Sequence, residues 1–173
     1  GGVLQSTQSN GCWGEGLHLV AEADESDASF MLLSPEVAVV TNIDEDHMHT
    51  YDHDFLRLTQ GFLQFLQHIP AHGLAVLCWE DDAVRAVSRS LTVPFKTYGL
   101  CDQADVWASD VVYDGMSCHF VVHGLPMLSP MPMTVALPGR HNILNALAVL
   151  TVAAHLQIPA VACQQALQQF SGV

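Results

Sequence analysis

The sequence has few cationic side chains and no long apolar run. Only five lysines and arginines accompany 18 aspartates and glutamates among its 173 residues, so the formal net charge is -13. A surface with that charge repels phosphate backbones and anionic headgroups, which argues against binding to nucleic acid or to a membrane. No apolar run reaches the ~18 residues that a membrane span needs, and no signal peptide is visible.

The cysteines show no disulfide or zinc pattern. They number five, which is odd, and no C-x-x-C pair occurs. Cys78, Cys118 and Cys163 lie in apolar runs, where buried free thiols are common. We therefore expect a reducing, cytoplasmic compartment, without a disulfide framework or a structural zinc site.

The first hundred residues alternate between strand and helix patterns. Half of the sequence is hydrophobic and only 13% is charged, so one folded domain, or one lobe of a larger enzyme, is expected. We predict strands at 17–23, 37–43, 73–79 and 95–100, and helices at 54–69 and 80–91. The continuous apolar run at 37–43 is typical of a central strand covered on both faces. This order predicts an α/β fold with a mostly parallel sheet, right-handed crossovers and flanking helices.

The rest of the chain has a different pattern. Short strand-like runs separated by turn signals fill 105–137, which predicts a small antiparallel sheet or an extension at the edge of the main one. Helical spacing follows at 142–156, and Pro159 begins a second helix that we expect to end at Ser171-Gly172.

An acidic cluster follows the first predicted strand. Glu22, Asp24, Glu25 and Asp27 fall within six residues. Since ligands of parallel α/β sheets gather beyond the carboxyl ends of strands, these acids could meet the "TNIDEDHMHTY" segment after the second strand. Glu22 would then lie near Asp44, Asp46 or His47 and form part of a Mg²⁺ or Mn²⁺ site.

Two other readings of these side chains stay open. Asp24, Ser26 and Asp27 could instead cap the following helix or stabilise a solvated turn. His47, His49 and His53 could form a transition-metal site, or could be ordinary surface residues.

A third polar stretch is "PGRHNILNA", residues 138–146. Arg140, His141 and Asn142 lie at the expected start of a helix, and Asn145 follows Asn142 on the same face. N–H groups at a helix start, together with asparagine amides, can bind a planar heterocycle or an anion. The alternative is a helix that Asn142 caps, beside a solvated Arg140.

Together, "AEADESDASF", "TNIDEDHMHTY" and "GRHNILNA", in this order, resemble the Mur ligase family of peptidoglycan synthesis. The resemblance covers essentially the whole chain, and is strongest to the member that joins L-alanine to UDP-N-acetylmuramate. It implies a P-loop-like central ATPase domain of a three-domain enzyme, between an N-terminal UDP-substrate domain and a C-terminal Rossmann-like domain. The implied reaction phosphorylates the carboxylate with ATP and Mg²⁺, and the alanine amine then attacks the acyl phosphate.

The resemblance also implies roles for individual residues. Glu22 and His47 would be the catalytic Mg²⁺-binding pair. His141, Asn142 and Asn145 would bind the nucleotide, with the two asparagines near the adenine. The substrate carboxylate or its metals would lie near three neighbouring residues: Asp24, Glu25 and Ser26.

The sequence departs from the family pattern in two places. A phosphate loop of the G-x-x-G-K-[ST] type is absent from these residues, and in relatives it lies upstream of the opening Gly-Gly. His49 stands where the family usually has an acid, "HMDTY". We therefore expect this piece to be inactive without the loop and the other two domains. The alternatives are a non-catalytic nucleotide- or metal-binding module, or a related ligase with another amino-acid acceptor.

Overall fold

The computed structural model describes residues 9–126, 130–170 and 172, and its centre is one six-stranded sheet in the order β1-β2-β3-β4-β5-β6. Its strands are β1 (Val37–Val40), β2 (Leu74–Cys78), β3 (Phe95–Gly99), β4 (Val106–Asp114), β5 (Ser117–His123) and β6 (Met131–Val135). The first four strands are parallel, and β5 and β6 are antiparallel to their neighbours. The predicted fold class is confirmed, and the antiparallel strands extend the main sheet.

Among the described residues, four α-helices and two 3₁₀ turns accompany the strands, and α3 and α4 follow the last strand. They are η1 (Ser29–Leu32), η2 (Met48–Tyr51), α1 (Phe55–Gln67), α2 (Asp82–Ser88), α3 (Arg140–His155) and α4 (Ala160–Gln169). Asp54 caps α1 by accepting the Leu56 N–H at 2.9 Å, and Asp81 caps α2 by accepting the Val84 N–H at 2.8 Å. Within the described ranges, no helix has the length and apolar character that crossing a membrane requires.

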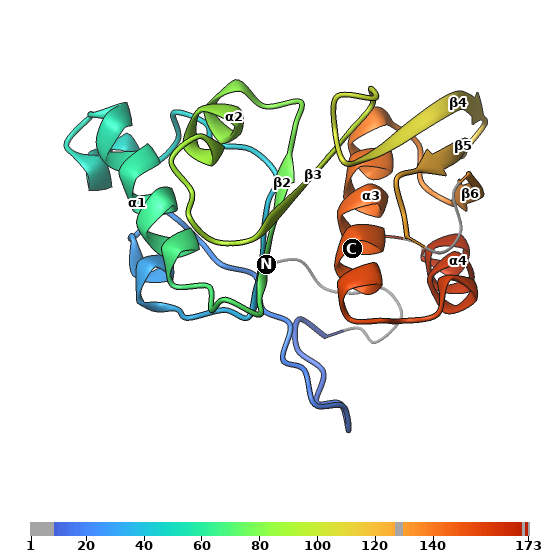
Figure 1. The fold of residues 1–173 in the computed structure, drawn as a ribbon, viewed down its shortest axis with the longest axis horizontal. Coiled ribbons are helices and arrows are strands. Elements are labelled where there is room, and N and C mark those ends of the chain that lie inside the picture. Colours follow the sequence, from blue (N-terminus) through green and yellow to red (C-terminus); the bar gives the residue numbers. More distant parts are fainter. Residues whose placement is uncertain (1–8, 127–129, 171, 173) are drawn as a thin grey trace.

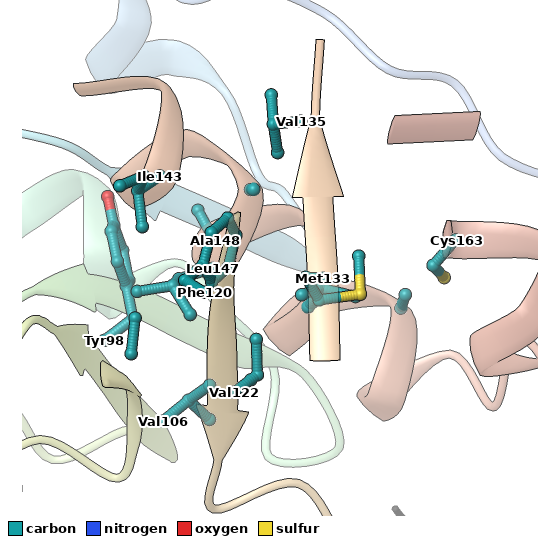
Figure 2. Packing of buried hydrophobic residues seen from close by; sticks show 14 of the residues in the cluster. Tyr98, Val106, Phe120, Val122, Met133, Val135, Ile143, Leu147, Ala148 and Cys163 are labelled. Carbon is teal, nitrogen blue, oxygen red and sulfur yellow. The ribbon is translucent and has the colours of Figure 1, made fainter. Parts of the chain in front are cut away.

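The sheet separates two hydrophobic cores. Helices α1 and α2 lie on one side of β2 and β3, and α3 lies on the other (Figure 1). Strand β2 is buried throughout: Ala75 and Leu77 face the α1 side, whereas Val76 and Cys78 face the α3 side. On the α3 side, Ile143 and Leu147 pack among side chains of β3, β4 and β5 (Figure 2).

The predicted strand at 17–23 is wrong. These residues form no strand, and Leu17, Leu19 and Val20 are more than 90% exposed. An apolar run becomes a strand only when a neighbouring strand takes up its backbone hydrogen bonds. Here β1 pairs only with β2 among the described strands, so the 17–23 segment has no such neighbour.

Smaller differences concern the bounds and the environment of elements. The strand predicted at 37–43 ends at Val40 and lies at the edge of the sheet, with Val39 44% exposed, so it is not covered on both faces. Helix α3 begins at Arg140, earlier than predicted. Helix α4 ends at Gln169, and the predicted stop at Ser171 lies outside the described residues. All five cysteines are free, and Cys78, Cys118 and Cys163 are buried as expected.

Candidate functional site

A cavity of about 350 Å³ opens beyond the carboxyl ends of the parallel strands. Its lining comes from the residues after β1, from the end of β2 and the residues after it, from β3, and from the first turns of α3: Thr41, Asn42, Cys78, Glu80, Asp81, Tyr98, His141, Leu144 and Asn145. Ligand sites of open α/β sheets occupy this position, and the volume falls within the range of small-molecule pockets. We refer to this set as the nucleotide cavity, after the ligand that the sequence predicts for His141 and Asn145.

The floor of the nucleotide cavity is apolar but carries one buried hydroxyl. Tyr98 is fully buried, and its hydroxyl has no hydrogen-bond partner among the described residues. Burial, together with the neighbouring Cys78 thiol, raises the pKa of Tyr98 well above its ordinary value. Burial likewise raises the pKa of Cys78. Both groups therefore stay protonated and neutral at physiological pH, so the floor carries no charge.

The wall of the nucleotide cavity is the start of α3. Gly139 occupies the N-cap with φ 107°, and a Cβ there would come within 2.8 Å of the His141 ring. A side chain at position 139 is therefore excluded, and the His141 ring lies against the glycine. His141 and Asn145 line the cavity. The sequence predicts that both bind the nucleotide.

Asn142 has a different environment from Asn145. Its amide donates a 2.8 Å hydrogen bond to the Pro138 carbonyl, and Asn142 is not among the cavity-lining residues. It is also not the N-cap, because that position belongs to Gly139. Asn142 therefore stabilises the turn into α3, and His141 and Asn145 supply the exposed polar groups.

The acidic residues lie in a second region, which we call the acidic edge: residues 22–27 and 44–54. Asp24 accepts the Ser26 N–H at 2.8 Å, and Asp27 accepts the Ser29 N–H at 2.9 Å. The hydrogen bonds with the side chain and the backbone N–H of Ser26 lower the pKa of Asp24, and electrostatic interaction with the nearby His47 lowers it further. The turn-stabilising reading is therefore confirmed for Asp24 and Asp27.

Two side chains of η2 join the halves of the acidic edge. Thr50 donates its hydroxyl to the Ser26 carbonyl at 2.5 Å, and the Tyr51 hydroxyl donates to the Glu25 carbonyl at 2.6 Å. Tyr51 is buried, whereas Glu25 and Ser26 are half-buried. Segments that are some 25 residues apart in sequence therefore meet here, although no strand at 17–23 brings them together.

The predicted metal ligands Glu22 and His47 belong to opposite halves of the acidic edge. Glu22 is exposed, and the His47 side chain is 43% exposed, at a backbone φ of 50°. In the described ranges, no three His, Cys, Asp or Glu side chains are grouped to hold a metal ion, so His47, His49 and His53 do not form such a group. The Glu22 carboxylate fits a Mg²⁺ ion whose other ligands are water and substrate phosphate, since Mg²⁺ is commonly held by one or two carboxylates in that way. An imidazole is a less usual ligand for Mg²⁺, so His47 is the weaker half of the predicted pair.

Sequence reasoning missed two residues that line the nucleotide cavity, Tyr98 and Glu80, and the contact of Arg140 with one of them. Tyr98 reads as an ordinary strand residue, and Glu80 as an acid at a helix start. Arg140, for which the sequence left open a ligand-binding or a solvated role, is 60% exposed and donates from Nη2 to Oε2 of Glu80, 60 residues away. The only sequence signal for this pair was a cation in the first turn of a helix, where the macrodipole disfavours positive charge.

The profile of the Mur ligase middle domain matches residues 14–153. A UDP-N-acetylmuramate–L-alanine ligase of Aromatoleum aromaticum is 48% identical over 174 residues, and one of Nitrosomonas europaea is 46% identical over 176 residues. Each alignment covers 100% of this chain and 37% of the relative, so the chain spans little more than a third of their length.

The fold has solved counterparts as well. The crystal structure of a UDP-N-acetylmuramate–alanine ligase from Thermotoga maritima matches with a TM-score of 0.73 at 24% identity, over 87% of this chain and 32% of that one. A MurF structure from Acinetobacter baumannii matches with a TM-score of 0.69 at 22% identity, over 86% of this chain and 32% of that one. At these identities the two structures support the fold of this chain.

Proposed function

Because the chain belongs to the Mur ligase family through its middle domain, we propose that it is the central, ATP-binding domain of a ligase that joins L-alanine to UDP-N-acetylmuramate. The near-half identity to two ligases of that name supports this acceptor over that of other Mur-type ligases. The remaining two thirds of such a ligase would supply the UDP-substrate domain, the phosphate loop and the C-terminal domain.

The observation that carries the proposal is the nucleotide cavity. Polar groups from three distant stretches meet there, after β1, after β2 and at the start of α3. A planar base would lie over the neutral floor formed by Tyr98 and Cys78, and the Asn145 amide would hydrogen-bond its edge. The segment that precedes β1 would then direct the phosphates of ATP toward the acidic edge.

The proposed chemistry explains why a chain with few cations carries so many acids. The carboxylate of UDP-N-acetylmuramate attacks the γ-phosphorus of ATP, a C–O–P bond forms, and ADP leaves. The alanine amine attacks the acyl carbon, the C–N bond forms, phosphate leaves and the amine loses a proton. Bound Mg²⁺ would offset the repulsion between the carboxylate and the phosphates, with Glu22 and His47 as its protein ligands.

Asp24, Glu25 and Ser26 would face the substrate carboxylate or its metals. Thr50 and Tyr51 hold the carbonyls of two of these residues, so the segment has a defined course next to His47. Free cysteines and the use of ATP support the cytoplasm as the place of the reaction.

The proposal is tested in the ligase that contains this chain, by ADP release with UDP-N-acetylmuramate, L-alanine, ATP and Mg²⁺. Glu22→Ala and His47→Ala should each lower kcat by about two orders of magnitude, because developing negative charge would lose stabilisation. Asn145→Ala should mainly raise the KM for ATP. The 173-residue chain alone should release no ADP.

Matched controls lie at the opposite end of the parallel strands. Glu36 and His72 have the same side-chain types, are exposed, and precede β1 and β2. Glu36→Ala and His72→Ala should leave the rate unchanged. Normal rates in the Glu22 and His47 variants would remove both from the metal site, and turnover by the chain alone would refute the need for the other domains.

A further inference from the structure

One ion pair joins the sheet to the helix that forms the wall of the nucleotide cavity. Arg140, the first residue of α3, donates from Nη2 to Oε2 of Glu80, which follows β2 and lines the cavity. The Glu80 side chain is only 22% exposed, whereas that of Arg140 is 60% exposed. Exposed ion pairs contribute little to stability, so a role for this pair depends on how firmly Glu80 is held.

Glu80 is held by the backbone of a third element. Its Oε1 accepts the Leu100 N–H, at the end of β3, at 2.9 Å. Gly99 leaves room for this contact, because a Cβ at that position would come within 2.9 Å of the same oxygen. One carboxylate therefore connects the ends of β2 and β3 to the start of α3.

The start of α3 has no side-chain cap of its own. Gly139 is at the N-cap, the Asn142 amide contacts the Pro138 carbonyl within the same turn, and the buried Cys118 thiol of β5 points to the Gly139 carbonyl at 3.9 Å. A cation in the first turn opposes the helix macrodipole, so Arg140 does not stabilise α3 by its charge alone. The contact with Glu80 fixes this turn relative to the sheet.

We propose that the pair of Glu80 and Arg140 is a positioning clasp for nucleotide binding. By fixing the first turn of α3 on the ends of β2 and β3, it sets the distance of His141 and Asn145 from the Tyr98 floor. The inference rests on the proposed function, since it assumes that the cavity takes the base of ATP. It predicts an effect on nucleotide affinity and none on the chemical step.

The test is a double-mutant cycle in the ligase that contains this chain. Glu80→Gln keeps an acceptor for the Leu100 N–H but removes the charge, and Arg140→Met removes the cation while keeping an aliphatic stem. Each single variant should raise the Kd for Mg²⁺-ADP in calorimetry, and the KM for ATP, by about three- to tenfold. The double variant should be no worse than either single one, because the same contact is lost in each.

Other readouts separate positioning from general damage. The kcat and the KM for UDP-N-acetylmuramate should stay within about twofold of the parent, and Arg140→Lys should restore part of the affinity. Without nucleotide, hydrogen exchange of residues 140–145 should be faster in both single variants. Lys96→Met is the matched control, because it breaks the 2.9 Å ion pair with Asp105 at the opposite end of β3.

Four outcomes would overturn the clasp. Additive effects, or an effect of Glu80→Gln without one of Arg140→Met, would mean that Glu80 acts on the ligand by itself. Unchanged nucleotide affinity in all three variants, with Asn145→Ala still weakening ATP, would reject the clasp and leave the proposed function intact. A ligase that binds no adenine nucleotide would reject both.

Discussion

The nucleotide cavity and the acidic edge are built in different ways. The cavity lies on regular elements: its floor is formed by β2 and β3, its wall by α3, and its buried groups Cys78 and Tyr98 belong to the core. The acidic edge consists of turns and a 3₁₀ segment, and the hydrogen bonds of Thr50 and Tyr51 with backbone carbonyls join its halves.

The comparison distinguishes a site whose side chains this domain holds in position by itself from a site that depends on other parts of the ligase. Side chains on packed strands and helices hold their positions within narrow limits, and side chains on turns do so only when something covers them. Glu22 follows a segment whose leucines and valine are more than 90% exposed. We therefore expect the base of the nucleotide to meet a preformed site, and the metal and phosphates to meet one that the rest of the ligase completes.

Hydrogen exchange on the 173-residue chain should reveal the largest contrast. Amides of β2 are buried in the sheet and should open only on global unfolding, whose free energy is about 5–15 kcal/mol for a domain. Amides of 17–21 should exchange within seconds, several orders of magnitude faster. Slow exchange at 17–21 would mean that this segment is paired in solution and that the two regions are equally ordered.

Tyr98→Ala should damage the nucleotide cavity most among single changes to its floor. Removing a fully buried aromatic ring leaves a void and should lower the free energy of unfolding by about 3–5 kcal/mol in urea titrations. Tyr98→Phe is the control: the hydroxyl has no partner in the described structure, so its loss should be near neutral. A large loss in Tyr98→Phe would show that the hydroxyl is satisfied in solution.

Asp105→Asn should have an intermediate effect on the free energy of unfolding. Asp105 contacts β3, the strand that forms part of the cavity floor. Partial burial opposes ionisation of Asp105, but hydrogen bonds from Thr97 and Lys96 outweigh it and lower the pKa of the carboxyl. Because the side chain is 38% exposed, solvent screens the pair, and we expect a loss of about 1 kcal/mol near neutral pH.

The pH dependence of the Asp105→Asn effect follows from the lowered pKa. A carboxyl whose pKa is lower in the folded state stabilises the fold fully above its unfolded pKa and loses that contribution as the pH falls through the folded pKa. The difference between parent and variant should thus be constant from about pH 5 to 7 and shrink below the ordinary value of 3.8. A difference that grows in acid would assign the effect to packing.

The smallest effect concerns the acidic edge itself. Ser26→Ala should raise the pKa of Asp24 toward its ordinary value, because the Ser26 side chain is the largest cause of the lowered pKa. NMR titration of the Asp24 carboxyl carbon would measure the change, and the melting temperature should not move. Ser29→Ala, which should act on Asp27 and leave Asp24 unchanged, is the matched control.

Prediction from the sequence succeeded where structure depends on local pattern. Helix α1 was predicted because its apolar spacing and the Asp54 cap lie within the same few turns. The segment 17–23 has the composition of a strand, but strand formation depends on a neighbour elsewhere in the fold. The same limit hid Glu80, whose partners Leu100 and Arg140 are 20 and 60 residues away.

The sequence alone determined the family of the chain, the order of most of its strands and helices, and the residue types available for a cation and a nucleotide, since these are properties of composition and spacing. Only the tertiary structure decided which of these residues meet: His141 and Asn145 at the cavity, Asn142 turned to a carbonyl, and the acids in turns held by η2. The physical reason is that long-range hydrogen bonds and ion pairs depend on where strands end in space, which no local pattern encodes.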